Sequence, residues 1–120
     1  LTTNLNGTYT IDSLIVQADD NDAYKLYYWN LGSSSWDLAW YVPAVGGWGL
    51  QTRPNASNDS EKYPLPAPIV TNKFKFEGDY QNSDKYFSVS EFQAFGVPEP
   101  GTLLLLVLGL MALAGARRRS

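Results

Sequence analysis

The chain has 120 residues, with nine Lys and Arg against twelve Asp and Glu, and it contains neither Cys nor His. The missing Cys excludes disulfides and thiolate metal sites, and the missing His removes the commonest general base and every triad that uses imidazole. Residues 1–96 hold six Lys and Arg against eleven Asp and Glu, a net charge of −5, and all 17 aromatic residues. Because nucleic-acid binding needs clustered positive charge, we expect no nucleic-acid partner. We also expect no enzymatic activity.

The first half of the chain alternates apolar and polar residues in short runs, which indicates β-strands. Tyr9 and Ile11, for example, alternate with Thr8 and Thr10. The acidic run over residues 18–22 is typical of a turn, since Asp and Asn are frequent turn formers. We expect strands over 7–17, 23–30 and 36–42, a hairpin loop over 31–35, and the end of the third strand in the Gly-rich run 43–49.

The second half continues the same pattern. We expect a short strand over 50–53, an exposed loop over 54–61, strand signal over 62–65 and 69–78, a turn over 79–84 and one or two strands over 85–96. Phe74 and Phe76 should face one side of their strand, with Lys73, Lys75 and Glu77 on the other. No segment of 1–96 has the pattern of an amphipathic helix, so the sequence predicts an all-β sandwich or jelly roll.

Three stretches resemble the discoidin, or coagulation-factor C-terminal-type, domain of the galactose-binding-like superfamily. They are "YTIDSLIVQADDNDAYKLYYWN", "SSSWDLAWYVP", and "VTNKFKFEG" followed by "KYFSVSEFQAFG". The resemblance covers residues 5–97 and implies a galactose-binding-like jelly-roll β-sandwich. It departs at the start, where the family's opening strand is missing, so the sandwich is expected to be N-terminally truncated. The sequence starts at Leu1 with neither a Met nor a signal peptide, and because the tail implies export we expect the chain to be the C-terminal part of a longer precursor.

The resemblance also implies where a ligand binds, namely in loops at one end of the sandwich. Trp48, between two glycines, is the best loop aromatic for stacking on a sugar, and Arg53 could clamp hydroxyl groups. Tyr86 or Phe87 matches the place of a stacking ring in sugar-binding relatives. The alternative for Trp48 is a cover packed on the end of the sandwich. Three further tryptophans lie in expected strands and are assigned to the core: Trp29, Trp36 and Trp40.

Two acidic features raise the question of a structural calcium ion. The run Asp19, Asp20, Asn21 and Asp22 is rich in oxygen ligands, but it lacks the Gly and closing Glu of an EF-hand, which favours a solvated turn. In calcium-binding members of the superfamily a Glu of the closing strand is a ligand, which makes Glu91 a candidate. The alternative for Glu91 is an edge-strand carboxylate.

The last 24 residues differ from the rest in composition. Residues 101–116 carry no charge over 16 positions, which as a helix would reach about 24 Å, short of the roughly 30 Å hydrocarbon core. Length alone does not decide among three alternatives: a signal-like apolar region, an interfacial helix and a marginal transmembrane span. Arg117, Arg118 and Arg119 favour the cytoplasmic side and can extend the span by snorkelling.

The segment before the apolar run favours a processed anchor. Pro98 and Pro100 each hold the residue before them, Val97 and Glu99, in extended geometry, the shape that a processing enzyme accepts. "VPEPG", the apolar run and the terminal arginines together resemble the PEP-CTERM sorting signal of exported bacterial proteins. The resemblance implies recognition of Pro98, Glu99 and Pro100 by exosortase, a membrane-embedded Cys protease or transpeptidase, and cleavage near them. We therefore expect a body over 1–96 and a sorting signal over 97–120, with a transmembrane helix over about 102–116.

These expectations combine into one hypothesis for function. The protein is exported, membrane-anchored with its body outside, and then released to the cell surface or an extracellular matrix, where the body binds a polysaccharide without catalysis. Two alternatives stay open. The body is an adhesive sandwich that binds proteins and has no sugar site, or it is the targeting module of a larger hydrolase.

Overall fold

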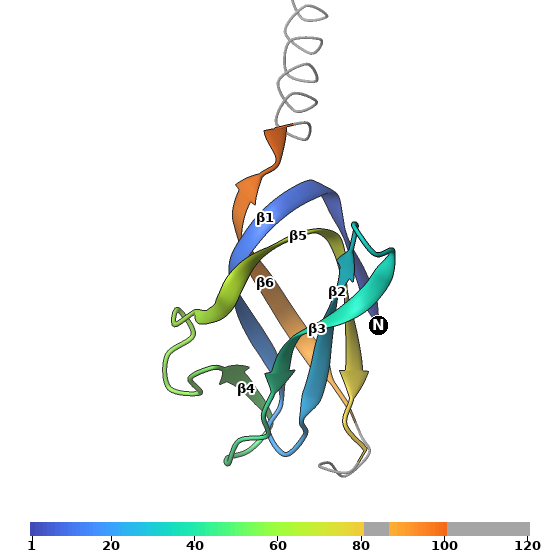
Figure 1. The fold of residues 1–120 in the computed structure, drawn as a ribbon. Helices are drawn as coiled ribbons and strands as arrows, with labels where there is room; N and C mark the ends of the chain where they lie inside the picture. Colours follow the sequence, from blue (N-terminus) through green and yellow to red (C-terminus); the bar gives the residue numbers. More distant parts are fainter. Residues whose placement is uncertain (81–86, 101–120) are drawn as a thin grey trace, which may run out of the picture.

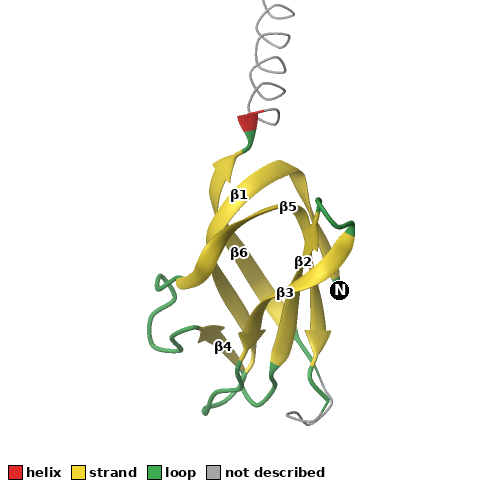
Figure 2. Ribbon diagram, viewed as in Figure 1, coloured by secondary structure: helices red, strands yellow, loops and turns green. Residues whose placement is uncertain are grey.

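The computed structural model describes residues 1–80 and 87–100, which form six β-strands and their loops (Figure 1). Apart from Pro100, the last of these residues, no helix occurs among them (Figure 2). The strands are β1 (Thr2–Asp19), β2 (Tyr24–Asn30), β3 (Ser35–Val42), β4 (Leu50–Arg53), β5 (Tyr63–Gly78) and β6 (Val89–Pro98). The prediction of an all-β body is confirmed.

All strand pairs are antiparallel, in the order β3-β2-β5-β1-β4, and β6 pairs with β1. The long strands β1 and β5 bend the sheet over on itself. Residues 2–4 of β1 pair with 73–75 of β5, whereas residues 9–14 pair with 63–71. One layer therefore contains β3, β2 and the second half of β5, and the other contains the second half of β1 with β4 and β6, as in a β-sandwich (Figure 1).

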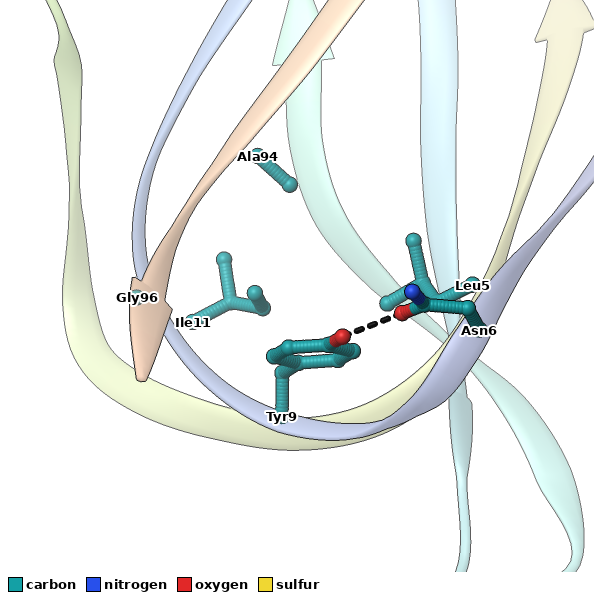
Figure 3. A pocket seen from close by; sticks show the side chains of 6 residues that line it. All are labelled: Leu5, Asn6, Tyr9, Ile11, Ala94 and Gly96. Carbon is teal, nitrogen blue, oxygen red and sulfur yellow. Dashed lines mark hydrogen bonds between the residues drawn. The ribbon is translucent and has the colours of Figure 1, made fainter. Parts of the chain in front are cut away.

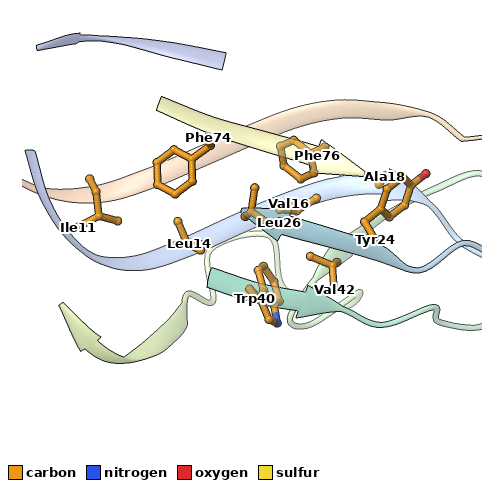
Figure 4. Close-up of a cluster of buried hydrophobic side chains, with 10 residues drawn as sticks. All are labelled: Ile11, Leu14, Val16, Ala18, Tyr24, Leu26, Trp40, Val42, Phe74 and Phe76. Atoms are coloured by element: carbon orange, nitrogen blue, oxygen red, sulfur yellow. The ribbon is translucent and has the colours of Figure 1, made fainter. Parts of the chain in front are cut away.

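The core lies between these two layers (Figure 4). Phe92 of β6 packs edge-on against Phe74 and Phe76 of β5, with ring centroids 5.0 and 5.2 Å apart. These contacts join the layers across the core, and burial of such aromatic surface is the main stabilising contribution in a domain of this size. The buried cluster consists of Ile11, Leu14, Val16, Ala18, Tyr24, Leu26, Trp40, Val42, Phe74 and Phe76.

Two strands are longer than the sequence pattern predicts. β1 starts at Thr2, before the expected residue 7, because the backbone of Leu1 exchanges hydrogen bonds with Phe76 and Thr2–Asn4 continue the ladder. β5 runs unbroken through Pro64, Pro66 and Pro68. The ladder with β1 shifts register between Pro64 and Ile69, so Pro66 and Pro68 have no paired residue on β1 and their missing N–H groups interrupt no ladder there. β2 pairs with β5 only over 74–78, so the prolines lie where β5 needs no second partner.

The strand tryptophans divide between the two faces of the sheet. Trp40 is buried in the core at 5% exposure and stacks on Tyr63 at 4.3 Å. Trp29 and Trp36 are only half-buried, so their assignment to the core was wrong. A β-bulge between Leu26 and Tyr27 changes which residues of β3 lie opposite the inward side chains of β2, and sequence alternation alone does not locate such a bulge.

Candidate functional site

One end of the sandwich gathers two loops around the turn that follows β1 (Figure 1, lower end). Asp20 donates from its backbone N–H to Gly49 O at 2.9 Å and accepts from Val45 N–H at 2.8 Å, which attaches the 43–49 loop. On the other side, Asp19 N–H donates to Ser88 O at 2.9 Å. The loops that carry the candidates Trp48 and Phe87 are therefore both fixed to consecutive residues of this turn.

Arg53 contacts the same turn, and its side chain has no exposed surface. Its guanidinium donates to the carbonyls of Ala18, Asp19, Asp20 and Asp22, including 2.8 Å from Nη1 to Ala18 O. Further hydrogen bonds reach the carbonyls of Gln51 and Pro43 at 3.1 Å. A guanidinium whose N–H groups are all directed to backbone oxygens has no donor left for a ligand. The structure therefore gives Arg53 a structural place where the sequence analysis expected a ligand clamp.

Burial also acts on the charge of Arg53. Desolvation lowers the pKa of its guanidinium below the ordinary value, and interactions with Tyr24 and with the neighbouring aspartates oppose this shift. The group stays charged at neutral pH because an Arg pKa lies far above 7. The buried cation thus acts as a fixed positive charge beneath an acidic turn.

Trp48 is the most exposed large apolar residue described, with 94% of its surface accessible. Gly47 and Gly49 on either side have φ values of 117° and 74°, a left-handed region that residues with a Cβ rarely adopt. Gln51 Nε2 donates to Trp48 O at 3.0 Å. The ring is thus presented to solvent by a backbone that hydrogen bonds hold in place, and the alternative of a cover packed on the sandwich does not fit this exposure.

Phe87 is half-buried beside the same turn. Its ring meets Tyr24 edge-on at 5.7 Å and Tyr80 at 5.1 Å, and it lines a hollow of about 210 Å³ with Leu1, Phe76 and Val89. Phe87 therefore packs against the core more than a free stacking ring would, and its binding role stays a prediction. Tyr86 lies outside the described residues.

The acidic candidates do not converge on a metal site in the described part of the chain. Glu91 is exposed on β6 and accepts a hydrogen bond from Gln93 Nε2 at 2.9 Å. Within residues 1–80 and 87–100, no three Asp or Glu side chains lie close enough to hold an ion together. The run 19–22 forms the end of β1 and the turn described above. A calcium role for Glu91 stays a prediction with no described companion ligand.

A second hollow, at the bend of β1, is small and has few free polar groups (Figure 3). Its volume is about 190 Å³, below the roughly 300 Å³ of a typical ligand pocket. The two polar side chains of its lining, Tyr9 and Asn6, hydrogen-bond to each other. Its other lining residues are Leu5, Ile11, Ala94 and Gly96. We therefore assign no binding or catalytic role to this hollow.

The Pro-Glu-Pro motif continues directly from the folded body. Val97 and Pro98 are the last residues of β6 and pair with Thr10 and Tyr9 of β1. Glu99 N–H donates to Thr8 O at 2.9 Å, and the Glu99 carboxylate accepts a hydrogen bond from the Thr10 hydroxyl. The motif is extended only at its start, because Pro98 ends β6 whereas Pro100 is helical, and one of its edges is paired with β1.

The expected helix over 102–116 and the cluster Arg117–Arg119 lie outside the described residues. Among those that are described, there is no helix of the length and apolarity needed to cross a bilayer.

Comparison with known families matches residues 96–119 to the PEP-CTERM protein-sorting motif. The match spans the motif of Pro98, Glu99 and Pro100, the apolar run and all three terminal arginines. It supports an exported protein that starts as a membrane-anchored precursor and is processed by exosortase. No family model matched the discoidin-like stretches, and neither the curated proteins nor the solved structures gave a significant match.

Proposed function

We propose that the body of this exported protein is a non-catalytic carbohydrate-binding module. Exosortase processing would deliver it to the cell surface or to an extracellular matrix, where polysaccharides are abundant ligands. The sandwich would present the module, and the loop end would contact the sugar. The jelly-roll topology of the discoidin-like family is part of this proposal.

The observation that carries the proposal is the position of Trp48. Apolar faces of sugars stack on aromatic rings, and a ring that is already fixed loses little conformational entropy when the sugar binds. Trp48 meets the first condition because its ring is 94% exposed, and it meets the second for the backbone of its loop, which is hydrogen-bonded to Asp20 and Gln51. Exposed aromatic residues on ordered loops are frequently functional.

A glycan array tests the proposal on the full chain. The protein would be kept in a polyoxyethylene detergent, which carries neither sugar nor charge and covers the apolar tail. Wild type should bind a subset of glycans, and Trp48→Ala should weaken that binding about tenfold, the loss of one good stacking contact. Leu31→Ala is the matched control, since Leu31 is also an exposed apolar residue but belongs to the loop between β2 and β3, which lies away from the lower end of the sandwich (Figure 1).

The outcomes separate the proposal from its alternatives. If wild type bound no glycan but captured other exported proteins, the body would be an adhesive module. A catalytic domain upstream in the precursor would make it the targeting module of a hydrolase. Equal binding by wild type and Trp48→Ala would remove the loop end from the site.

A further inference from the structure

The outer face of the β3-β2-β5 layer carries a cluster of aromatic and basic side chains, which we call the aromatic–lysine face: Tyr27, Trp29, Trp36, Lys73 and Lys75. Trp29 and Trp36 are partners in the β2-β3 ladder, and their rings meet edge-on at 5.2 Å. Tyr27 lies opposite Lys75 in the β2-β5 ladder. The cluster thus extends over three adjacent strands of one layer.

The two lysines rest on these rings. Lys73 Nζ lies 4.4 Å from the centre of the Trp29 ring and 5.5 Å from that of Trp36. Lys75 Nζ lies 4.9 Å from Trp36 and 5.0 Å from Tyr27. In the described part of the chain, both ammonium groups therefore interact with rings and not with carboxylates. A ring face attracts the charge but leaves the N–H donors free for a further partner.

This face looks onto solvent and away from the core. The alternate residues of the same strands, Leu26, Phe74 and Phe76, point inward and are buried. Leu38 of β3 lies opposite Tyr27 on the outer side and is 53% exposed. The core therefore does not need the outward aromatic side chains, and the layer presents a broad surface on which a chain-like ligand can lie.

Charge indicates the kind of ligand that fits. Residues 1–96 carry a net charge of −5 and only six basic side chains. Three of the six, Lys25, Lys73 and Lys75, lie on this side of the layer, and only Lys25 faces an acidic partner in the ladder, Glu77. Lys73 and Lys75 thus form a local positive patch on an acidic molecule, which complements a negatively charged partner.

We propose that the aromatic–lysine face binds an acidic polysaccharide, with carboxylates of uronic-acid units on Lys73 and Lys75 and sugar rings against Trp36 and Trp29. The proposal rests on the proposed carbohydrate-binding function and adds a second surface and a ligand class to it. Single-stranded nucleic acid is the competing occupant, because bases also stack on aromatic rings. The sorting motif favours the polysaccharide, because it supports export of the body to a location where polysaccharides are abundant ligands.

The test measures binding of the full chain, in polyoxyethylene detergent, to polygalacturonate, neutral dextran and oligo-dT by affinity electrophoresis. Wild type should be retarded by polygalacturonate and not by dextran or oligo-dT, and salt should weaken the retardation. Replacing both Lys73 and Lys75 with Met keeps their apolar stems over the rings and removes the charges. This double variant should raise the Kd for polygalacturonate about tenfold, since each exposed ion pair contributes up to about fivefold.

The controls separate charge from fold. Lys62→Met is the matched control, because Lys62 Nζ also lies over a ring, that of Phe95 at 4.2 Å, on the other layer. It should bind like wild type, and replacing Lys73 and Lys75 with Arg should retain binding. If the Lys73 and Lys75 variant bound polygalacturonate like wild type while Trp48→Ala did not, this face would be refuted and the carbohydrate function would stand. Binding of no glycan would refute both, and retardation by oligo-dT alone would refute the ligand class.

A separate observation concerns the sorting motif. We infer that folding of the body withdraws the motif from exosortase, so that processing requires the end of β6 to leave β1. Val97, Pro98 and Glu99 are all joined to β1, through strand pairing, through the Thr8 carbonyl and through the Thr10 hydroxyl. The four residues from Val97 to the start of the apolar run span at most about 14 Å, so the enzyme has little chain to grasp while the motif stays paired.

A reversible cross-link tests this inference in cells that contain the exosortase. Thr10 and Val97 are ladder partners, at a spacing that a disulfide can bridge, and the chain has no other Cys. The variant with Cys at both positions should be processed when reduced and accumulate as precursor when oxidised. Gln17 and Glu91 are partners in the same pair of strands, remote from the motif, and Cys at these two positions should leave processing unchanged in both states. Equal processing of the oxidised and reduced Thr10 and Val97 variant would refute the inference.

Discussion

Arg53 Nη2 lies 3.0 Å from the carbonyl oxygen of Asp22, 31 residues earlier in the chain. The same guanidinium reaches carbonyls of β1, of the turn and of the segment after β3. A single buried side chain thus fixes the relative positions of the segments that meet at the loop end. The orientation of Trp48 depends on this arrangement, because its loop is attached to the same turn.

Arg53→Met should therefore destabilise the body strongly. Met fills a similar volume but leaves several buried carbonyls without donors, which should lower the free energy of unfolding by about 3 to 5 kcal/mol. Urea unfolding followed by Trp fluorescence measures the change. Lys62→Met removes an exposed cation of similar length and should change the unfolding free energy by less than about 0.5 kcal/mol. A loss of similar size in both variants would contradict the structural role of Arg53.

Tyr24 makes stability depend on pH at the alkaline end. Its ring is buried, and its hydroxyl donates to Ser88 O at 3.1 Å and accepts from Ser88 N–H at 2.9 Å. Desolvation raises the pKa of Tyr24 above its ordinary value of 10.0, and this outweighs the opposing backbone hydrogen bond. The folded state thus holds this proton more tightly than the unfolded state, so its contribution is complete below pH 10 and is lost as pH rises through the folded-state pKa.

Urea unfolding between pH 8 and pH 11 checks this sign. The midpoint for wild type should fall above pH 10 more steeply than the midpoint for Tyr24→Phe, which lacks the titrating hydroxyl. Tyr41→Phe is the control, since Tyr41 is 39% exposed and its hydroxyl contacts Asp79 at the surface. Parallel pH profiles for wild type and Tyr24→Phe would show that Tyr24 does not link stability to pH.

The all-β class follows from sequence because alternation and turn residues act locally. The pattern of Phe74 and Phe76 against Lys73 and Lys75 is confirmed, as is the short strand β4. The length of β5 was not predictable, because three prolines normally end a strand and are tolerated here only on an unpaired edge. Whether an edge is paired depends on the whole topology.

The candidate site shows the same limit. The exposure of Trp48 follows from its two flanking glycines, which is a local signal. The burial of Arg53 depends on carbonyls from distant segments, which no local pattern reveals. The outward position of Trp36, opposite to that of Trp40, depends on a register shift between β2 and β3, whereas Trp29 follows the alternation of β2. A further indication in the sequence was that Lys73 and Lys75 alternate with phenylalanines that are buried, which places the two lysines on an outer face.

Gly96→Ala should detach the end of β6. A Cβ at this position would lie 1.8 Å from Thr10 O and 2.9 Å from Ile11 Cα, both backbone atoms that cannot rotate away. Overpacking against backbone should lower the free energy of unfolding by about 3 kcal/mol. Gly46→Ala is the matched control, because nothing lies within 4 Å of its added Cβ. Thermal unfolding followed by circular dichroism compares the stability of the two variants. A Gly96→Ala variant as stable as wild type would mean that β6 does not approach β1 this closely.

We expect Glu99 to act on processing in two opposite directions, as part of the recognition motif and as the partner of Thr10 that holds the end of β6 on β1. Glu99→Ala removes the recognition motif and should leave unprocessed precursor, as should deletion of Arg117–Arg119. Thr10→Val keeps the motif intact but removes the hydroxyl that donates to the Glu99 carboxylate, so the end of β6 should leave β1 more readily. Since one hydrogen bond contributes about 1 kcal/mol, processing of Thr10→Val should be up to about fivefold faster than wild type.

A pulse-chase of precursor and mature protein in exosortase-containing cells measures the rate of processing of all three variants. Thr2→Val is the control, because Thr2 also lies on β1 but pairs with Lys75 of β5, away from Glu99. Slower processing of Thr10→Val would mean that pairing with β1 presents the motif to the enzyme, and normal maturation of Glu99→Ala would exclude Glu99 from recognition.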